Sequence, residues 1–79
     1  MHRIRIEIES ESGNIIFNSL RYEEAPRAKI KWDKKGKKVF LEIEADSISN
    51  LRAAINSFAK WIHMVERIVE TMKEIKNKG

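Results

Sequence analysis

Strict alternation of apolar and polar residues marks three segments of the chain. Residues 3–9 (RIRIEIE) place isoleucine at every second position, with arginine or glutamate between. The same period of two runs through residues 28–33 and 39–45. Because successive side chains of a strand point to opposite faces, each segment predicts a strand with one buried and one charged face.

The second and third segments are separated by the sequence DKKGKK, which predicts a β-hairpin. Gly36 can adopt the positive φ that tight hairpin turns require. On the exposed face, lysines of the second strand are candidates to pair with glutamates of the third.

Helical spacing indicates a first helix between residues 10 and 26. Ile16 and Leu20 form an i, i+4 apolar pair. Gly13 weakens the helical pattern, and the sequence NIIF is also compatible with a strand. The pattern alone therefore leaves both structures open for this segment.

Capping residues suggest where the helices begin and end. Ser10 or Ser12 is suited to cap the first helix, and Pro26 ends it at the latest. Asp46 or Ser47 is suited to cap a second helix, because a short side-chain oxygen accepts a bond from a first-turn N–H. No proline or glycine interrupts residues 47–78, which as a helix would be about 45 Å long.

The expected order is strand, helix, strand, strand, helix. A right-handed first crossover allows the third strand to lie between the first and the second, so that all neighbours are antiparallel. We therefore expect an α+β fold: a single domain, residues 1–79, with a three-stranded antiparallel sheet and two helices on its isoleucine face. The first and second strands are the sheet edges and are candidate pairing sites.

The long helix carries an apolar stripe that is wider than a plain coiled-coil seam. Its main row has steps of three and four: Ile48, Leu51, Ile55, Phe58, Ile62, Val65, Val69 and Met72. A second row lies beside it: Ala54, Trp61, Ile68 and Ile75. The small residues Ala53, Ala54 and Ser57 form a patch where another helix could approach.

The stripe is longer than the sheet that it would cover. Strands of about seven residues span about 23 Å, roughly half the length of the helix. Residues 51–62 are therefore expected to be core, and residues 65–75 to overhang the sheet. We expect Ile68, Val69, Met72 and Ile75 to be exposed in a monomer and to mark a protein partner.

Composition narrows the function classes. At 79 residues the core is small, and small domains often need a staple. The absence of cysteine excludes disulfides and thiolate metal sites, so a partner chain is the staple that remains. We find no signal peptide and no segment able to span a membrane, and we expect a cytoplasmic protein without a membrane partner.

No constellation of catalytic residues is present. The two histidines, His2 and His63, have no ligand-like spacing and no evident orienting partner. The strand glutamates alternate along open faces, which is typical of solvated carboxylates and not of an acid/base pair. Gly36 is the turn of a hairpin and not part of a phosphate-binding loop. We expect no enzyme activity, no cofactor and no metal site.

A net charge of +4 is compatible with RNA contact without being diagnostic. The hairpin lysines Lys34, Lys35, Lys37 and Lys38 are either a solvated tip or contacts to phosphates. Because no aromatic residues are interleaved with them, a base-stacking platform is not expected. We add Lys60, from the long helix, to this candidate nucleic-acid set.

The stretch ADSISNLRAAINSFAKWI resembles the signature of the small Pcc-type subunit of the KEOPS complex, the CTAG/Pcc family. The matching residues are Leu51, Arg52, Ala53, Ala54, Asn56, Ser57, Phe58, Lys60, Trp61 and Ile62. The stretch IIFNSLRYEEAPRAKI is similar to the family's first helix and the chain that follows it, which favours a helix for NIIF. The resemblance extends over nearly the whole chain.

The resemblance implies a non-catalytic scaffold subunit. In the family this subunit dimerises, its helices bundle against an ASKHA-type catalytic subunit, and it supports tRNA binding for N6-threonylcarbamoyladenosine modification. With the helical stripe, the resemblance gives the expected partner-binding residues: Ile16, Leu20, Arg52, Asn56, Phe58, Trp61, Val65, Ile68, Val69 and Met72.

Two departures from the family pattern bear on the partner. Lys60 stands where arginine is common, and the two are not equivalent at a bidentate site. The tail over residues 66–79 is longer than usual. Some archaea have a paralogue that forms a heterodimer with the ordinary subunit, so the dimer partner is either a second copy or a paralogue.

Two other functions fit the residues. The chain could be a stand-alone RNA-binding module that uses the lysine hairpin. It could also be an unrelated helical dimerisation adaptor, which would need the stripe but not Arg52, Asn56 or Trp61.

Overall fold

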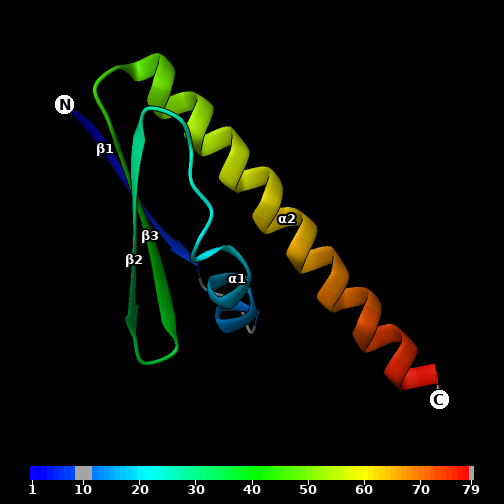
Figure 1. Ribbon diagram of the computed structural model, residues 1–79. Coiled ribbons are helices and arrows are strands. Elements are labelled where there is room, and N and C mark those ends of the chain that lie inside the picture. The colour runs from blue at the N-terminus through cyan, green and yellow to red at the C-terminus, as the bar shows by residue number, and fades with distance from the viewer. Residues whose placement is uncertain (9–11, 79) are drawn as a thin grey trace.

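The computed structural model describes residues 1–8 and 12–78, with side chains described as far as residue 75. The elements follow in the order β1 (His2–Ile8), α1 (Gly13–Leu20), β2 (Ala28–Lys35), β3 (Lys38–Ala45) and α2 (Ile48–Lys78). The strands form an antiparallel sheet in the order β1-β3-β2, and both helices lie on one side of it (Figure 1). The predicted α+β fold, with the third strand in the centre, is confirmed.

The register places like side chains on one face across all three strands. Ile43 of β3 lies between Ile4 of β1 and Ile30 of β2, and Glu42 lies between Arg5 and Lys31. Side chains on the isoleucine face pack under the helices, whereas arginine, lysine and glutamate cover the other face. The predicted alternation is confirmed over the described part of each strand; Glu9, which was expected to extend β1, lies outside the described residues.

The β2–β3 hairpin closes through Gly36 and Lys37. Gly36 has a φ of 62°, in the left-handed region that glycine adopts without steric cost. This confirms the turn predicted from the lysine-flanked glycine.

The core lies between β3 and the two helices. Its fully buried side chains are those of Phe58, Ile16, Leu41, Ile43 and Val39. Four aromatic rings cross the core edge to face: the centroids of Phe17 and Trp32 are 5.8 Å apart, those of Trp32 and Phe58 6.2 Å, and those of Phe58 and Trp61 5.1 Å. Such T-shaped pairs add a directional attraction to the burial of the rings.

The segment predicted as helix or strand forms helix α1. It ends at Leu20, six residues before Pro26, which was its latest possible end. Ser12 occupies the cap position and its carbonyl accepts the N–H of Ile16 at 2.9 Å, while Ser10 lies outside the described residues. The helix ends at Leu20, whose carbonyl accepts the N–H of Glu23 at 3.0 Å. Leu20 and, in the loop that follows, Ala25 both pack in the core.

Gly13 was interpreted only as a weak point of this helix, and the structure gives it a packing role. Gly13 is buried at the start of α1, and a Cβ added to it would lie 3.3 Å from Cγ2 of Val39. The missing side chain therefore lets α1 approach the central strand closely.

Helix α2 begins after a serine cap. Ser47 Oγ accepts the N–H of Asn50 at 3.1 Å, so of the two proposed caps Ser47 is the one used. The helix then crosses the sheet and continues well beyond it (Figure 1). The molecule accordingly measures 50 × 24 × 17 Å, and its length is that of the helix.

Candidate protein and nucleic-acid interfaces

Two apolar hollows follow one another along the second half of α2, and α1 contributes to each. One is lined by Leu20, Glu23, Trp61, Met64, Val65 and Ile68. The other is lined by Ile15, Val69, Met72, Lys73 and Ile75. We call the two together the α1–α2 groove.

The groove exposes large apolar side chains. The exposed fractions are 47% for Ile15, 53% for Met64, 56% for Ile68, 64% for Met72 and 67% for Ile75. Exposed apolar residues are ordinary when scattered, but a contiguous patch of this kind marks an interaction site.

Helical geometry explains why these residues share one flank of α2. At 100° per residue, Trp61, Met64 and Ile68 fall on one side of the helix, and the same side continues to Met72 and Ile75. Beside the first part of this flank α1 supplies Leu20, and beside the later part it supplies Ile15. Toward residue 75 the helix runs past the sheet (Figure 1), and Met72 and Ile75 stay exposed.

The predicted boundary between core and overhang is shifted by one turn. Val65 was expected to begin the overhang, but it packs against the core. Val69 is half-buried, whereas Ile68, Met72 and Ile75 are exposed as expected. The shift arises because α1 extends the covered region beyond the sheet.

The expected partner-binding residues divide into three groups. Trp61, Val65, Ile68, Val69 and Met72 all line the groove. Ile16 and Phe58 are fully buried, and Leu20 is buried apart from its contribution to the groove wall, so these three serve the core first. Arg52 and Asn56 are exposed on the opposite side of α2, together with Lys60.

Two groove residues, Ile15 and Met64, were not singled out from the sequence. Met64 lies three residues after Trp61 and so belongs to the same helical flank. This spacing could have identified it, but the two apolar rows assigned to the helix did not include it. Ile15 could be assigned to the surface only after the packing of Ile16 was known. Of the expected small-residue patch, Ala54 is 2% exposed and packs on the core, whereas Ala53 is exposed and Ser57 is half-buried.

On the charged face of the sheet, the arginines of β1 form ion pairs with carboxylates of β3 and β2. Arg3 Nη2 lies 3.1 Å from Glu44 Oε1, and Arg3 Nε lies 3.3 Å from Glu42 Oε1. Arg5 reaches Glu42 Oε2 and Asp33 Oδ2, each at 3.4 Å, and its guanidinium lies 4.4 Å from the ring centroid of Phe40. The glutamates of β3 are thus paired with arginines and not with the lysines of β2 that were candidates for them.

This pairing leaves the hairpin lysines uncompensated. Lys29 and Lys31 face Glu44 and Glu42 in the register, yet within the described residues neither has a carboxylate within 4.0 Å. The same is true of three of the four candidate lysines at the tip, Lys34, Lys35 and Lys37. Lys38 is the exception and lies 3.5 Å from Glu7 Oε1. The β2 edge and the tip therefore form a cationic surface.

Lys60 does not belong to this surface. It lies two residues after buried Phe58, about 200° around the helix, and so points away from the sheet. The four hairpin lysines share the tip of the hairpin but not one face: Lys34 lies beside Phe17 on the helix face, whereas Lys35 and Lys38 face each other on the charged face. Lys60 lies apart from all four.

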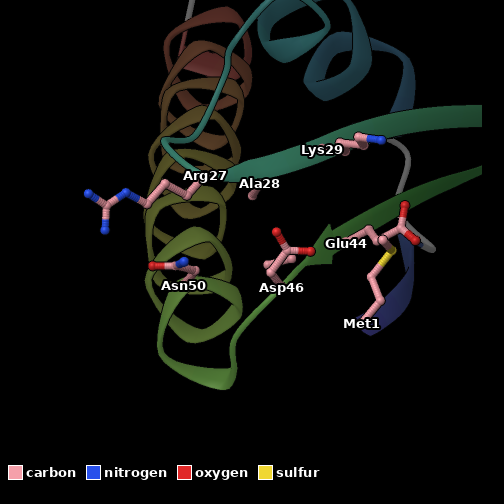
Figure 2. A pocket seen from close by; sticks show the side chains of 8 residues that line it. Met1, Arg27, Ala28, Lys29, Glu44, Asp46 and Asn50 are labelled. Carbon is pink, nitrogen blue, oxygen red and sulfur yellow. The ribbon is translucent and has the colours of Figure 1, made fainter.

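A further hollow lies where the sheet meets the start of α2. Figure 2 shows Arg27, Lys29, Glu44, Asp46 and Asn50 around it. Arg27 and Lys29 point in different directions, so the charged groups do not converge on one position (Figure 2). Among the described residues no cluster of three or more histidine, aspartate or glutamate side chains could hold a metal ion. A membrane-spanning helix is likewise not found among them.

Comparison with known proteins decides the family. The family model described as "Transcription factor Pcc1" matches residues 1–70. The chain belongs to the Pcc1 family. A relative from Pyrococcus abyssi (strain GE5 / Orsay), named "KEOPS complex subunit Pcc1", is 32% identical over 65 residues, which cover 76% of this chain and 79% of the relative.

The Pcc1 match includes β1, both strands of the hairpin and most of α2. The resemblance noted in the sequence is thereby confirmed at the level of the family. Of its signature residues, Ala54 and Phe58 are buried in the core, while Arg52, Asn56 and Lys60 form the exposed outer row of α2.

Proposed function

We propose that this chain is a non-catalytic scaffold subunit of a KEOPS complex. In this proposal it dimerises with a second copy or a paralogue, binds the ASKHA-type catalytic subunit through its helices, and assists tRNA binding for N6-threonylcarbamoyladenosine modification. The observation that carries the proposal is the exposed α1–α2 groove in a member of the Pcc1 family. The name of the Pyrococcus relative, a KEOPS subunit, supports it.

The groove suits a helical partner. It is elongated along α2, and its exposed anchors Met64, Ile68, Met72 and Ile75 recur at helical spacing. A helix laid against this flank would complete a bundle with α1 and α2 and bury the side chains that now face solvent. No other described element of this chain lies on the end of α2 (Figure 1).

The description of the family model as a transcription factor suggests a different role. We follow the complex-subunit name because an exposed apolar groove suits a protein partner. The cationic side chains on the outer face of α2, Arg52, Lys60 and Arg67, are spaced about two turns apart and do not form the dense row that would suit a DNA groove. Nucleic-acid contact belongs, in this proposal, to the hairpin.

The test is co-purification with the other KEOPS subunits of the source organism. We expect the tagged chain to capture the catalytic subunit. Replacing Ile68 with glutamate places a charge in the groove and should abolish capture, while circular dichroism and thermal unfolding stay close to wild type because Ile68 is mostly exposed. Arg67→Glu, one residue away on the outer side of α2, is the matched control and should retain capture.

Two results would contradict the proposal. Wild-type protein that never captures the catalytic subunit would exclude the scaffold role. Equal loss of folding and capture in Ile68→Glu would mean that Ile68 is core, and that the groove is not an interface.

The contribution to tRNA binding rests on the uncompensated lysines. Cationic side chains without carboxylate neighbours retain their full attraction for phosphates and need break no ion pair to bind them. Lys34, Lys35 and Lys37 meet this condition, and the ammonium group of Lys34 is kept near the helices by its position 5.4 Å from the ring centroid of Phe17. Such contacts position an RNA backbone without reading its sequence.

Salt dependence measures these contacts. Changing Lys34, Lys35 and Lys37 to glutamine should lower the magnitude of the slope of log affinity for tRNA against log salt by about 2. The control changes Arg52, Lys60 and Arg67 to glutamine, which removes the same charge from the outer face of α2 and should leave the slope closer to wild type. Equal slopes for both triple variants would show that only net charge matters and that the hairpin is not a binding site.

A further inference from the structure

The outer edge of β2, on the side away from β3, is open. β2 is an end strand in the order β1-β3-β2, and no segment of the described chain pairs with its outer side. An open edge offers its backbone N–H and C=O groups to any extended chain that can align with it. The side chains on and around β2 determine which kind of chain that is.

The turn of the hairpin shows which backbone groups this edge presents. The turn has two residues, so Lys35 and Lys38, which flank it and face each other, are a hydrogen-bonded pair. Hydrogen-bonded and non-hydrogen-bonded pairs alternate along an antiparallel ladder. The N–H groups of Ile30 and Trp32 therefore point outward, whereas that of Lys31 points toward β3.

The charged face of this edge favours an acidic strand. Lys29 and Lys31 project from that face, and among the described residues neither has a carboxylate within 4.0 Å. Edge lysines discourage pairing with a neutral or cationic strand, and a second copy of β2 centred on Ile30 would place Lys29 opposite Lys31. Opposite charges stabilise a cross-strand pair, so these lysines suit a strand with a carboxylate at every second position.

A hollow beside the same edge favours apolar side chains on the other face of an added strand. It is lined by residues 28–31 of β2 and by residues 21–25 of the loop that follows α1. Ile30 is only half-buried although it faces the helices, and Tyr22 in the loop is 83% exposed. An exposed tyrosine beside a partly covered aliphatic side chain is typical of a protein interface.

The loop side of the hollow carries charges of both signs. The Arg21 guanidinium lies 4.9 Å from the ring centroid of Tyr22 and 5.2 Å from that of Phe17. Glu23 and Glu24 line the same hollow from the loop. These two carboxylates would repel acidic side chains on the helix side of an added strand. Such a strand therefore needs its acidic residues on the charged face of the sheet only.

We infer that the β2 edge binds an extended acidic segment of a partner protein, which joins the sheet as a fourth strand. Glutamate or aspartate of this segment lies opposite Lys29 and Lys31, and its alternate, aliphatic residues lie toward Ile30 and Tyr22. Backbone bonds to the outward groups of β2 supply affinity, and the alternating side chains supply specificity. The inference goes beyond the proposed function and does not depend on it, because this strand lies on β2 and not on the overhang of α2.

Titration of the intact chain with a synthetic peptide, followed by nuclear magnetic resonance, tests the inference. The probe is acetyl-Ser-Val-Glu-Val-Glu-Val-amide. Antiparallel to β2, it places its serine opposite Asp33 and its glutamates opposite Lys31 and Lys29. We expect saturable shifts along β2. At saturation the amides of Ile30 and Trp32 should exchange about fivefold more slowly, whereas that of Lys31, which already donates to β3, should change little.

Matched peptides and variants separate this site from general charge attraction. The peptide acetyl-Ser-Val-Lys-Val-Lys-Val-amide keeps the alternation, reverses the charge and should not bind. Changing Lys29 and Lys31 to glutamine should weaken binding of the acidic peptide about fivefold. Changing Lys35 and Lys37 to glutamine removes the same charge from the hairpin tip and should leave binding near wild type. Tyr22→Ala, at a side chain that is 83% exposed, should weaken binding while thermal unfolding stays close to wild type.

Four results would overturn the inference. They are the absence of saturable shifts at millimolar peptide, equal binding of the two peptides, equal weakening by the two lysine pairs, and slower exchange confined to the helices. A uridine hexanucleotide that shifts β2 where the acidic peptide does not would also overturn it, and would make this edge a nucleic-acid surface. None of these results bears on capture of the catalytic subunit, which Ile68→Glu tests separately.

Discussion

Gly13 and Gly36 are both glycine for different physical reasons. Gly13 provides space, because a Cβ at the start of α1 would crowd Cγ2 of Val39 at 3.3 Å. Gly36 is needed for conformation, since its φ is 62° while nothing lies within 4 Å of the position of a Cβ. The sequence predicted the second role from the hairpin pattern. The first depends on a contact between residues 26 positions apart, which no local pattern contains.

Gly36 should tolerate asparagine better than alanine. We expect Gly36→Ala to lower the free energy of unfolding by about 1 kcal/mol, because a left-handed φ strains any residue with a Cβ. Gly36→Asn should cost less, since asparagine enters this region more readily. Urea denaturation of both variants checks this. Identical losses would indicate that a contact of the turn, and not its φ, controls stability.

Phe58 should be among the most sensitive positions in the core. Its ring is fully buried and contacts those of Trp32 and Trp61. Phe58→Ala should reduce the free energy of unfolding by about 3–5 kcal/mol, through lost burial and the cavity left behind. Ile68→Ala, ten residues further along the same helix and mostly exposed, should change it by less than about 0.5 kcal/mol. Comparable losses at the two positions in urea denaturation would contradict the division of α2 into core and interface.

At the scale of elements, the strands were predictable because alternation is a local signal. Period two in residues 3–9, 28–33 and 39–45 indicated the three strands, their buried faces and the hairpin. The paired glutamates were less predictable, since cross-strand proximity allowed both the arginines of β1 and the lysines of β2 as partners. Which side chain reaches them depends on geometry, and the longer, forked guanidinium groups of β1 do so.

The helices were predictable in type and less so in extent. The overhang of α2 begins where α1 no longer covers it, and the extent of that cover depends on contacts between the two helices. The helical spacing of α2 predicted the groove residues Ile68 and Met72. It could not predict Ile15, because the position of Ile15 depends on how α1 packs against α2. Arg52 and Asn56, expected from the family signature to bind a partner, lie on another face of α2, and their role stays a prediction.

The cap of α2 offers a test at this scale. Ser47→Ala removes the oxygen that accepts the Asn50 N–H, and should lower the free energy of unfolding by about 1 kcal/mol. Ser49→Ala, in the first turn of the same helix and exposed, is the control and should stay within about 0.5 kcal/mol of wild type. Thermal or urea unfolding compares them. Equal effects would mean that the hydrogen bond contributes nothing specific.

At the scale of the whole molecule, a small sheet supports a helix that is too long for it. The 50 Å length of the molecule leaves the end of α2 projecting with its apolar flank open (Figure 1). A chain of 79 residues can bury only a small core. We therefore interpret the exposed apolar stripe of α2 as a surface that becomes buried in a larger assembly. The groove and the lysine hairpin lie on different parts of the surface, so binding at one leaves the other open.

Hydrogen exchange on the intact chain, with and without the catalytic subunit, tests the central claim most directly. The account predicts that the amides of residues 64–75 exchange at least tenfold more slowly in the complex, together with those of α1, because the overhang becomes part of a helical bundle. Unchanged exchange in residues 64–75 while the complex forms would contradict it, and would show that the projecting half of α2 is not the surface on which the partner binds.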